Sequence, residues 1–83
     1  MKKAIIVASF GTTYLPALKK SIEYIEEKIK LSFKEYDVYR SFTSRIITQK
    51  LATQGITIPR PAEILEELHN KGYEEIIIVP LHI

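Results

Sequence analysis

Cysteine is absent from this sequence, and neither sign of charge dominates it. Without cysteine the chain can form neither a disulfide framework nor a thiolate metal site, so burial of apolar side chains must hold it together. Twelve Lys and Arg face ten Asp and Glu, for a net charge of +2, and the two signs alternate along the chain. This is not the charge pattern of a nucleic-acid-binding protein, and we expect no nucleic-acid partner. The absence of cysteine fits a cytoplasmic location best.

Long hydrophobic runs are absent as well. The opening MKKAIIVASF has the two lysines and the apolar residues of a signal peptide, but its apolar run covers only residues 4–8. A signal core needs about 7–15 apolar residues, and a membrane span needs roughly 20. The sequence therefore predicts neither a cleaved signal nor a membrane partner.

What the sequence does contain is the composition of a small packed domain. Its 83 residues are 46% hydrophobic and 27% charged, close to the average for globular proteins. A chain of this length can build one core, and it buries a smaller share of its surface than a full-sized domain does. We therefore expect a partner surface or self-association to add to its stability.

The first half of the chain predicts a strand, a helix and a second strand. Residues 4–10, AIIVASF, form a short β-branched run typical of a strand covered on both faces. Helical spacing follows, with Pro16 in the first turn and a salt bridge between Glu26 and Lys30 expected on the solvent face. Residues 36–42, YDVYRSF, alternate as a strand does. The buried stripe of the helix is predicted to contain Leu15, Leu18, Ile22, Ile25 and Ile29.

The second half predicts two helices and a third strand. Thr43 or Ser44 can cap a short helix that ends near Leu51, and Pro61 can open another helix that Gly72 ends. Residues 75–79, EIIIV, form a further apolar run that continues through Pro80. Inward-facing residues are expected at Ile46, Ile47 and Leu51 in the first helix and at Ile64, Leu65 and Leu68 in the second.

This element order, β-α-β-α-α-β, predicts an α/β fold with an open parallel sheet of three strands flanked by helices. The connections are long enough for parallel pairing through right-handed crossovers. We expect residues 1–83 to form a single α/β unit. Such a sheet normally continues with more strands and a covering helix after a buried strand, so the pattern is that of half of a larger fold.

In open parallel sheets, ligands bind beyond the carboxyl ends of the strands. Three segments fall at that edge here, namely residues 9–14, 42–45 and 80–83. They supply hydroxyl groups, backbone N–H groups near helix starts, a guanidinium, aromatic rings and an imidazole. Such a set suits a large, flat, anionic ligand.

Each of these segments also has a simpler interpretation. The loop SFGTTY could hold a phosphate, but it lacks the Walker and GxGxxG patterns, and Gly11 could serve the turn while neighbouring hydroxyls cap a helix. Arg45 near a helix start hints at an anionic partner, although most such arginines are solvated. His82 follows a buried strand, whereas His69 is expected to face solvent near a helix end.

Three segments of the chain resemble, in the same order, the first part of the anaerobic cobalt chelatases, the sirohydrochlorin cobaltochelatases. These segments are MKKAIIVASFGTTY, YDVYRSFTSRII and GYEEIIIVPLHI. That family belongs to the chelatase superfamily with ferrochelatase, whose members have two similar α/β lobes around a tetrapyrrole. The resemblance implies that this chain is the amino-terminal lobe, or a fragment, of a lyase that inserts Co(II) into a sirohydrochlorin-type ring in anaerobic cobalamin biosynthesis. By carry-over, the tetrapyrrole-binding residues are Ser9, Phe10, Gly11, Thr12, Thr13, Phe42, Thr43, Ser44, Arg45 and His82.

The resemblance also implies what this chain lacks. The metal-binding histidines and the acidic residue of the family lie in its carboxyl-terminal half, so no catalytic residue, metal ligand or resident cofactor is assigned here, and cobalt is the substrate metal. The chain is expected to be inactive unless a missing half or a second copy completes it. The alternatives are a self-associating α/β module and a flavodoxin-like anion or nucleotide binder that uses SFGTTY.

Overall fold

The computed structural model describes residues 1–82, apart from the side chain of Lys19. Three parallel strands form one sheet in the order β2-β1-β3, with β1 (Lys3–Ser9) between β2 (Asp37–Phe42) and β3 (Glu75–Leu81). The α/β fold and the parallel sheet predicted from the sequence are therefore confirmed. The strand limits differ from the predicted ones by one or two residues.

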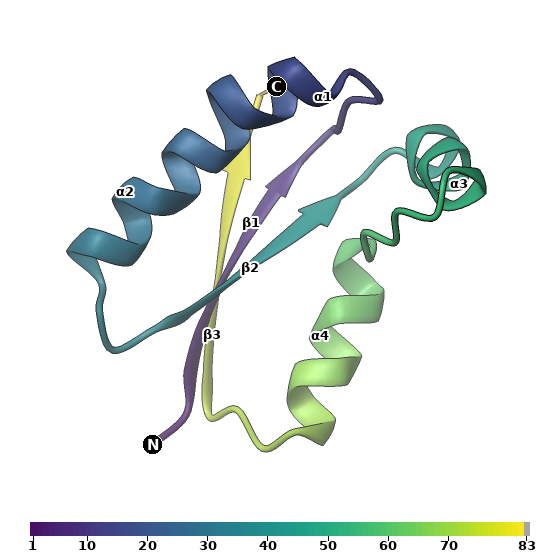
Figure 1. Ribbon diagram of the computed structural model, residues 1–83. Coiled ribbons are helices and arrows are strands. Elements are labelled where there is room, and N and C mark those ends of the chain that lie inside the picture. Colours follow the sequence, from purple (N-terminus) through teal and green to yellow (C-terminus); the bar gives the residue numbers. More distant parts are fainter. Residues whose placement is uncertain (83) are drawn as a thin grey trace.

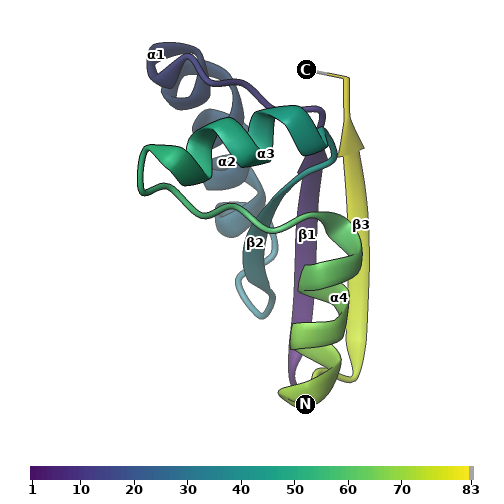
Figure 2. The ribbon, with the colours of Figure 1, turned by 90° about the vertical axis from the view of Figure 1, so that its right-hand side faces the viewer.

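Helices cover both faces of this sheet. One face carries a continuous helical stretch made of α1 (Leu15–Ala17), the π-helical segment η1 (Leu18–Glu23) and α2 (Tyr24–Ser32). The other face carries α3 (Arg45–Thr53) and α4 (Pro61–Asn70). Figure 1 shows the sheet between these two layers, and Figure 2 shows α4 in front of the sheet and β3 along its margin.

The core is centred on β1, which has buried side chains on both faces. Successive residues of a strand point to opposite faces, and both rows of β1 are closed to solvent, with Ile5 and Val7 in one row and Ala4 and Ile6 in the other. Ala4 and Ile6 pack with Ile64 and Leu68 of α4. A second cluster joins Leu18, Ile22, Phe42 and Leu51 near the carboxyl end of β2.

The first helix departs from the sequence prediction because of its π-helical segment. A π-helix bonds each residue to one five positions away, so every residue after it is rotated relative to an uninterrupted α-helix. Leu18 and Ile22 are buried as expected, and Glu26, which follows the π-helical segment, is buried at 7%. Leu15 precedes that segment, in the short α1, and is 44% exposed, so its predicted burial is wrong. The predicted Glu26–Lys30 salt bridge is also wrong, since Glu26 binds Arg40 and Lys30 lies beside Glu27.

The predicted N-cap of helix α3 is confirmed, but one of the residues predicted to be buried on this helix is exposed. The Ser44 hydroxyl accepts a hydrogen bond from the backbone N–H of Ile47 at 3.2 Å, as an N-cap serine should. Leu51 is buried and Ile47 is half-buried, four positions apart on one row. Ile46 is 67% exposed, so its predicted burial is wrong, because it lies off that row.

Strand β3 forms one margin of the sheet. Ile77 and Ile78, which point to opposite faces, are 41% and 44% exposed, and within residues 1–82 β3 pairs only with β1. A long apolar margin strand is unusual, because such edges readily pair with further strands. Its apolar side chains on both faces and its unpaired outer edge are typical of a strand that packs against further structure.

Candidate functional site

The carboxyl ends of the three strands lie level with one another. Ser9, the last residue of β1, pairs with Phe42 at the end of β2 and with Leu81 at the end of β3. Both ribbon views place the ends of these strands and the start of α3 at the same end of the molecule (Figures 1 and 2). We call this end the rim, and it comprises residues 9–14, 42–45 and 80–82, while Ile83 lies outside the described residues.

Backbone hydrogen bonds join the first two rim segments directly. The N–H of Thr43 donates to the carbonyl of Ser9 at 2.8 Å, and the N–H of Ser44 donates to the carbonyl of Phe10 at 3.1 Å. Within the first segment, the N–H of Tyr14 donates to the Thr12 hydroxyl at 3.0 Å. The two loops are thus one connected surface, while His82 follows the strand on the other side of β1.

Gly11 fits closely against Phe42 at the centre of this surface. Its φ angle of +112° is one that residues with a side chain rarely adopt, and a Cβ at this position would lie 2.7 Å from Cδ2 of the Phe42 ring. Phe42 is fully buried. The glycine is therefore required both for the turn and for the contact between the two loops.

The predicted site residues differ in how far a ligand could reach them. Phe10 is 60% exposed, and Thr13, Thr43, Arg45 and His82 are also exposed, while Gly11, Thr12 and Ser44 are half-buried. Ser9 and Phe42 are buried at 1% and 0%. These last two can shape the rim from beneath, and they cannot touch a ligand in this arrangement.

Ser9 and Ser41 are buried serines on adjacent strands with contrasting surroundings. The Ser9 hydroxyl finds no hydrogen-bond partner within residues 1–82, whereas the Ser41 hydroxyl donates to the Pro59 carbonyl at 3.0 Å. A buried polar group without a partner loses its hydration and gains nothing in return. Its presence at the end of β1 is a local cost to the stability of the fold.

This contrast predicts opposite effects of two matched substitutions. Ser9→Ala should leave the free energy of unfolding unchanged or raise it by up to about 1 kcal/mol, because it removes an unpaired buried group. Ser41→Ala should lower the free energy of unfolding by about 1 kcal/mol. Denaturant unfolding of both variants measures the difference, and a larger loss for Ser9→Ala than for Ser41→Ala would contradict it.

Sequence reasoning missed a fourth segment beside the rim, residues 59 and 60. The Pro59 carbonyl accepts hydrogen bonds from the Phe42 N–H at 3.1 Å and from the Ser41 hydroxyl. The Arg60 Nε donates to the Thr43 carbonyl at 3.3 Å. Two prolines around an arginine, in the segment IPRP, were the available signal, because they fix the backbone on both sides of that side chain.

A partly buried ion pair lies on the α2 face of the sheet. Arg40 donates from Nε and Nη2 to the Glu26 carboxylate at 2.7 and 2.6 Å, and Glu23 lies 3.8 Å from the same guanidinium. The hydrogen bonds to Glu26 raise the pKa of Arg40, and the nearby negative charges add to that effect. Through this pair Arg40 joins β2 to α2.

Tyrosine hydroxyls form a further polar cluster on the side of β2 that faces α4. The Tyr73 hydroxyl donates to Asp37 at 2.5 Å and lies 2.6 Å from the Tyr39 hydroxyl. The hydrogen bond to Asp37, followed by the one with Tyr39, raises the pKa of Tyr73. Because Asp37 and Tyr39 lie toward the amino end of β2, this cluster is at the opposite end of the strand from the rim.

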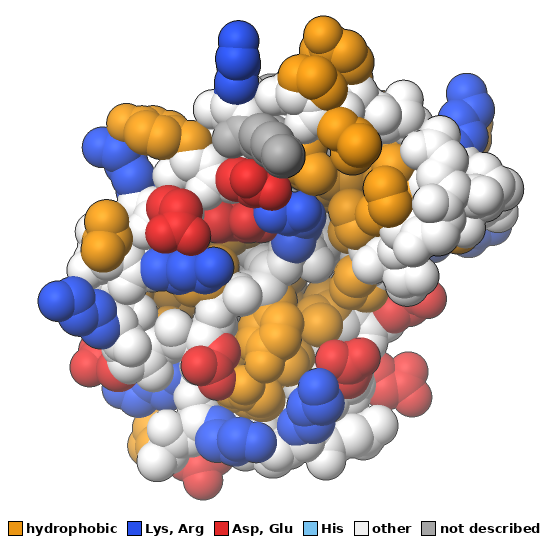
Figure 3. Space-filling model, viewed as in Figure 1, with side chains coloured by type: hydrophobic (Ala, Val, Ile, Leu, Met, Phe, Trp, Pro, Cys, Tyr) orange, Lys and Arg blue, Asp and Glu red, His pale blue; other side chains and the backbone are white. Residues whose placement is uncertain are grey.

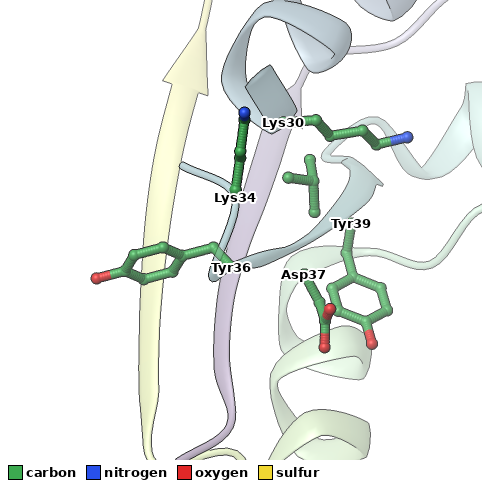
Figure 4. A pocket seen from close by; sticks show the side chains of 6 residues that line it. Lys30, Lys34, Tyr36, Asp37 and Tyr39 are labelled. Carbon is green, nitrogen blue, oxygen red and sulfur yellow. The ribbon is translucent and has the colours of Figure 1, made fainter. Parts of the chain in front are cut away.

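An open groove of about 580 Å³ runs beside the same part of β2. Figure 4 shows Lys30 and Lys34 above it, with Asp37 and Tyr39 pointing together toward α4 and Tyr36 pointing away from them. The Tyr36 hydroxyl donates to Glu75, and this hydrogen bond raises the pKa of Tyr36. Figure 3 shows this margin of the sheet, where apolar side chains lie between patches of both charges.

Residues 1–82 bring no three His, Cys, Asp or Glu side chains together as a metal ion would require. None of the helices in that range has the length and apolar character needed to cross a membrane.

Comparison with known proteins adds to this geometry. The model of the family described as Cobalt chelatase (CbiK) matches residues 3–83. The whole chain is 40% identical to the sirohydrochlorin cobaltochelatase of Salmonella typhimurium (strain LT2). The chain spans 32% of the length of that protein.

Proposed function

Because the chain belongs to the cobalt chelatase (CbiK) family, we propose that it is the amino-terminal part of a sirohydrochlorin cobaltochelatase and that its rim binds the tetrapyrrole. The observation that supports this best is the level arrangement of three strand ends, with two loops bonded to each other at the middle of the sheet. Ligands of open parallel sheets bind at this end. A flat ring needs an open surface of this kind and not a closed cavity.

The exposed and half-buried residues of the rim would contact two parts of the ligand, the ring itself and its carboxylate substituents. The Phe10 ring is available to stack on the macrocycle. The hydroxyls of Thr12, Thr13 and Thr43 and the guanidinium of Arg45 can donate hydrogen bonds to carboxylate substituents of a sirohydrochlorin-type ring. Ser9 and Phe42 would hold these loops in place from below.

In this proposal cobalt is a substrate, and other residues must present it. Inserting Co(II) requires a group that accepts the pyrrole protons and ligands that deliver the ion. We assign neither task to this chain, and we expect it to bind the tetrapyrrole without inserting the metal. The missing part of the protein, or a second copy, would supply these groups.

Strand β3 supports the need for a partner. Ile77 and Ile78 are exposed, and the outer edge of β3 pairs with no other strand of residues 1–82. Together they form an apolar surface of the kind that associates. A self-associating α/β module is therefore the second candidate function. Light scattering tests it, because a chain that stays monomeric at high concentration would exclude self-association.

Titration with sirohydrochlorin in the absence of oxygen tests the tetrapyrrole proposal. We expect a saturable change in the visible absorbance of the ligand, and no cobalt insertion when Co(II) is added to the complex. Phe10→Ala should weaken binding roughly fivefold, since it removes the stacking surface.

Phe33→Ala is the matched control for this titration. Phe33 is also an exposed aromatic residue, at 48%, but it lies at the end of α2 and outside the rim. Its removal should leave the affinity unchanged. No absorbance change at high ligand excess would overturn the proposal, and equal losses for the two variants would remove Phe10 from the site.

A further inference from the structure

Arg60 is held beside the rim by its neighbours in the chain. It is the N-cap residue of α4, with extended backbone angles of −82° and 161°. Pro61 follows it, and Pro59 before it is tied to β2 through the hydrogen bond from Phe42. Glu63 accepts a hydrogen bond from the Arg60 N–H at 2.8 Å. The backbone of Arg60 is therefore fixed on both sides before any ligand arrives.

The side chain of Arg60 is anchored at one nitrogen only. Its Nε donates to the Thr43 carbonyl at 3.3 Å, inside the rim. Among the side chains that the structure describes, none forms a salt bridge with its guanidinium, and the hydrogen bond to Thr43 is the one that it makes. Arg40 offers the contrast, since its guanidinium is bidentate with Glu26. Arg60 thus keeps its terminal N–H donors available.

The charge around Arg60 favours an anion. None of the three rim segments, residues 9–14, 42–45 and 80–82, contains Asp or Glu, and Arg45 adds a second positive charge beside Thr43. The carboxylate of Glu63 is the nearby exception, and it is engaged by the backbone N–H of Arg60. A guanidinium with free N–H groups binds a carboxylate through two parallel hydrogen bonds.

We propose that Arg60, with its Nε anchored on Thr43, is a binding residue of the rim that takes a carboxylate side chain of the tetrapyrrole. This inference rests on the function proposed above, and it adds a residue that lies outside the segments carried over from the family. The carboxylate replaces the water on the terminal nitrogens, and the anchored Nε sets the direction of the approach. Arg60 thereby orients the ring by one of its edges.

Sirohydrochlorin titration of Arg60 variants tests this inference. Arg60→Gln should weaken binding by on the order of tenfold, because a charged hydrogen-bond donor is lost. Arg60→Lys keeps the charge but not the two-pronged geometry, and it should fall between Arg60→Gln and the wild type. Circular dichroism of each variant establishes that the fold is kept.

Lys50→Gln is the control for the loss of one positive charge, because Lys50 is exposed on α3 and outside the rim. It should change the affinity by less than about twofold. A second measurement needs no variant, because the wild type should bind sirohydrochlorin in preference to a porphyrin that carries cationic pyridinium groups instead of carboxylates.

The outcomes separate this inference from the proposed function. If the wild type binds sirohydrochlorin and both Arg60 variants bind as tightly as it does, the role of Arg60 is wrong and the tetrapyrrole site stands. If the wild type prefers the cationic porphyrin, carboxylate recognition at the rim is wrong. If the wild type binds no sirohydrochlorin, both the site and the role of Arg60 are overturned.

Discussion

Replacing Gly11 with alanine should lower the free energy of unfolding by about 3 kcal/mol and separate the two bonded loops of the rim. Two effects add at this position. A φ of +112° strains any residue that has a side chain, at a cost of about 1–3 kcal/mol. The new Cβ would also lie 2.7 and 2.8 Å from two atoms of the Phe42 ring, and such overpacking of a buried ring costs about 1–3 kcal/mol more.

Gly55 and Gly72 provide matched controls for the strain alone. Their φ angles are +80° and +85°, and an added Cβ at either position meets no atom within 4 Å. Alanine at these sites should cost about 1 kcal/mol. Denaturant unfolding of the three variants compares their free energies of unfolding. Equal losses of stability would show that the close contact between Gly11 and Phe42 adds nothing to the cost.

Replacing Arg40 with methionine should have a similarly large effect, about 3 kcal/mol of lost stability. The change leaves the Glu26 carboxylate buried without its cation, and breaking a buried pair from one side costs about 3–5 kcal/mol. We expect the lower end of that range, because the Arg40 side chain is 26% exposed and that of Glu26 is 10% exposed. The free energy of unfolding of a whole domain is roughly 5–15 kcal/mol, so this loss is a large share of it.

Two further variants distinguish the pair from charge in general. Lys30→Met removes a cation whose pairing with Glu27, at 3.6 Å, joins side chains that are 53% and 67% exposed, and it should change stability by less than about 0.5 kcal/mol. The double variant Arg40→Met with Glu26→Leu should recover much of the loss, because apolar side chains can replace a buried ion pair. A double variant no more stable than Arg40→Met would contradict this account.

The strands could be predicted from the sequence because their signals are local. The apolar run of β1 reflects burial on both faces, and β2 is marked by its β-branched and aromatic residues; both signals appear directly in the order of residues. The burial of Glu26 could not be found in this way. It depends on η1, which changes the helical phase, and on Arg40 in a strand 14 residues away.

The rim, likewise, could be predicted only where it follows from the order of the strands, and not where it depends on contacts between residues far apart in the sequence. That residues 9–14 and 42–45 lie together follows from parallel pairing, which the connections between the strands already required. That Ser9 and Phe42 lie beneath the surface does not follow, because their burial depends on the loops and helices packed over them. Arg60 escaped prediction because its contact with Thr43 spans 17 residues and joins a helix cap to a loop.

The place of β1 in the sheet has a consequence for synthesis. Lys3–Ser9 precedes in the chain both of its neighbours in the sheet, Asp37–Phe42 and Glu75–Leu81, so it leaves the ribosome before either of them. This apolar strand therefore stays unpaired on one side until Glu75–Leu81 has been synthesised. Exposed strands of this kind are where misassembly starts. A chaperone that shields Lys3–Ser9 until Glu75–Leu81 has left the ribosome would protect this strand from misassembly.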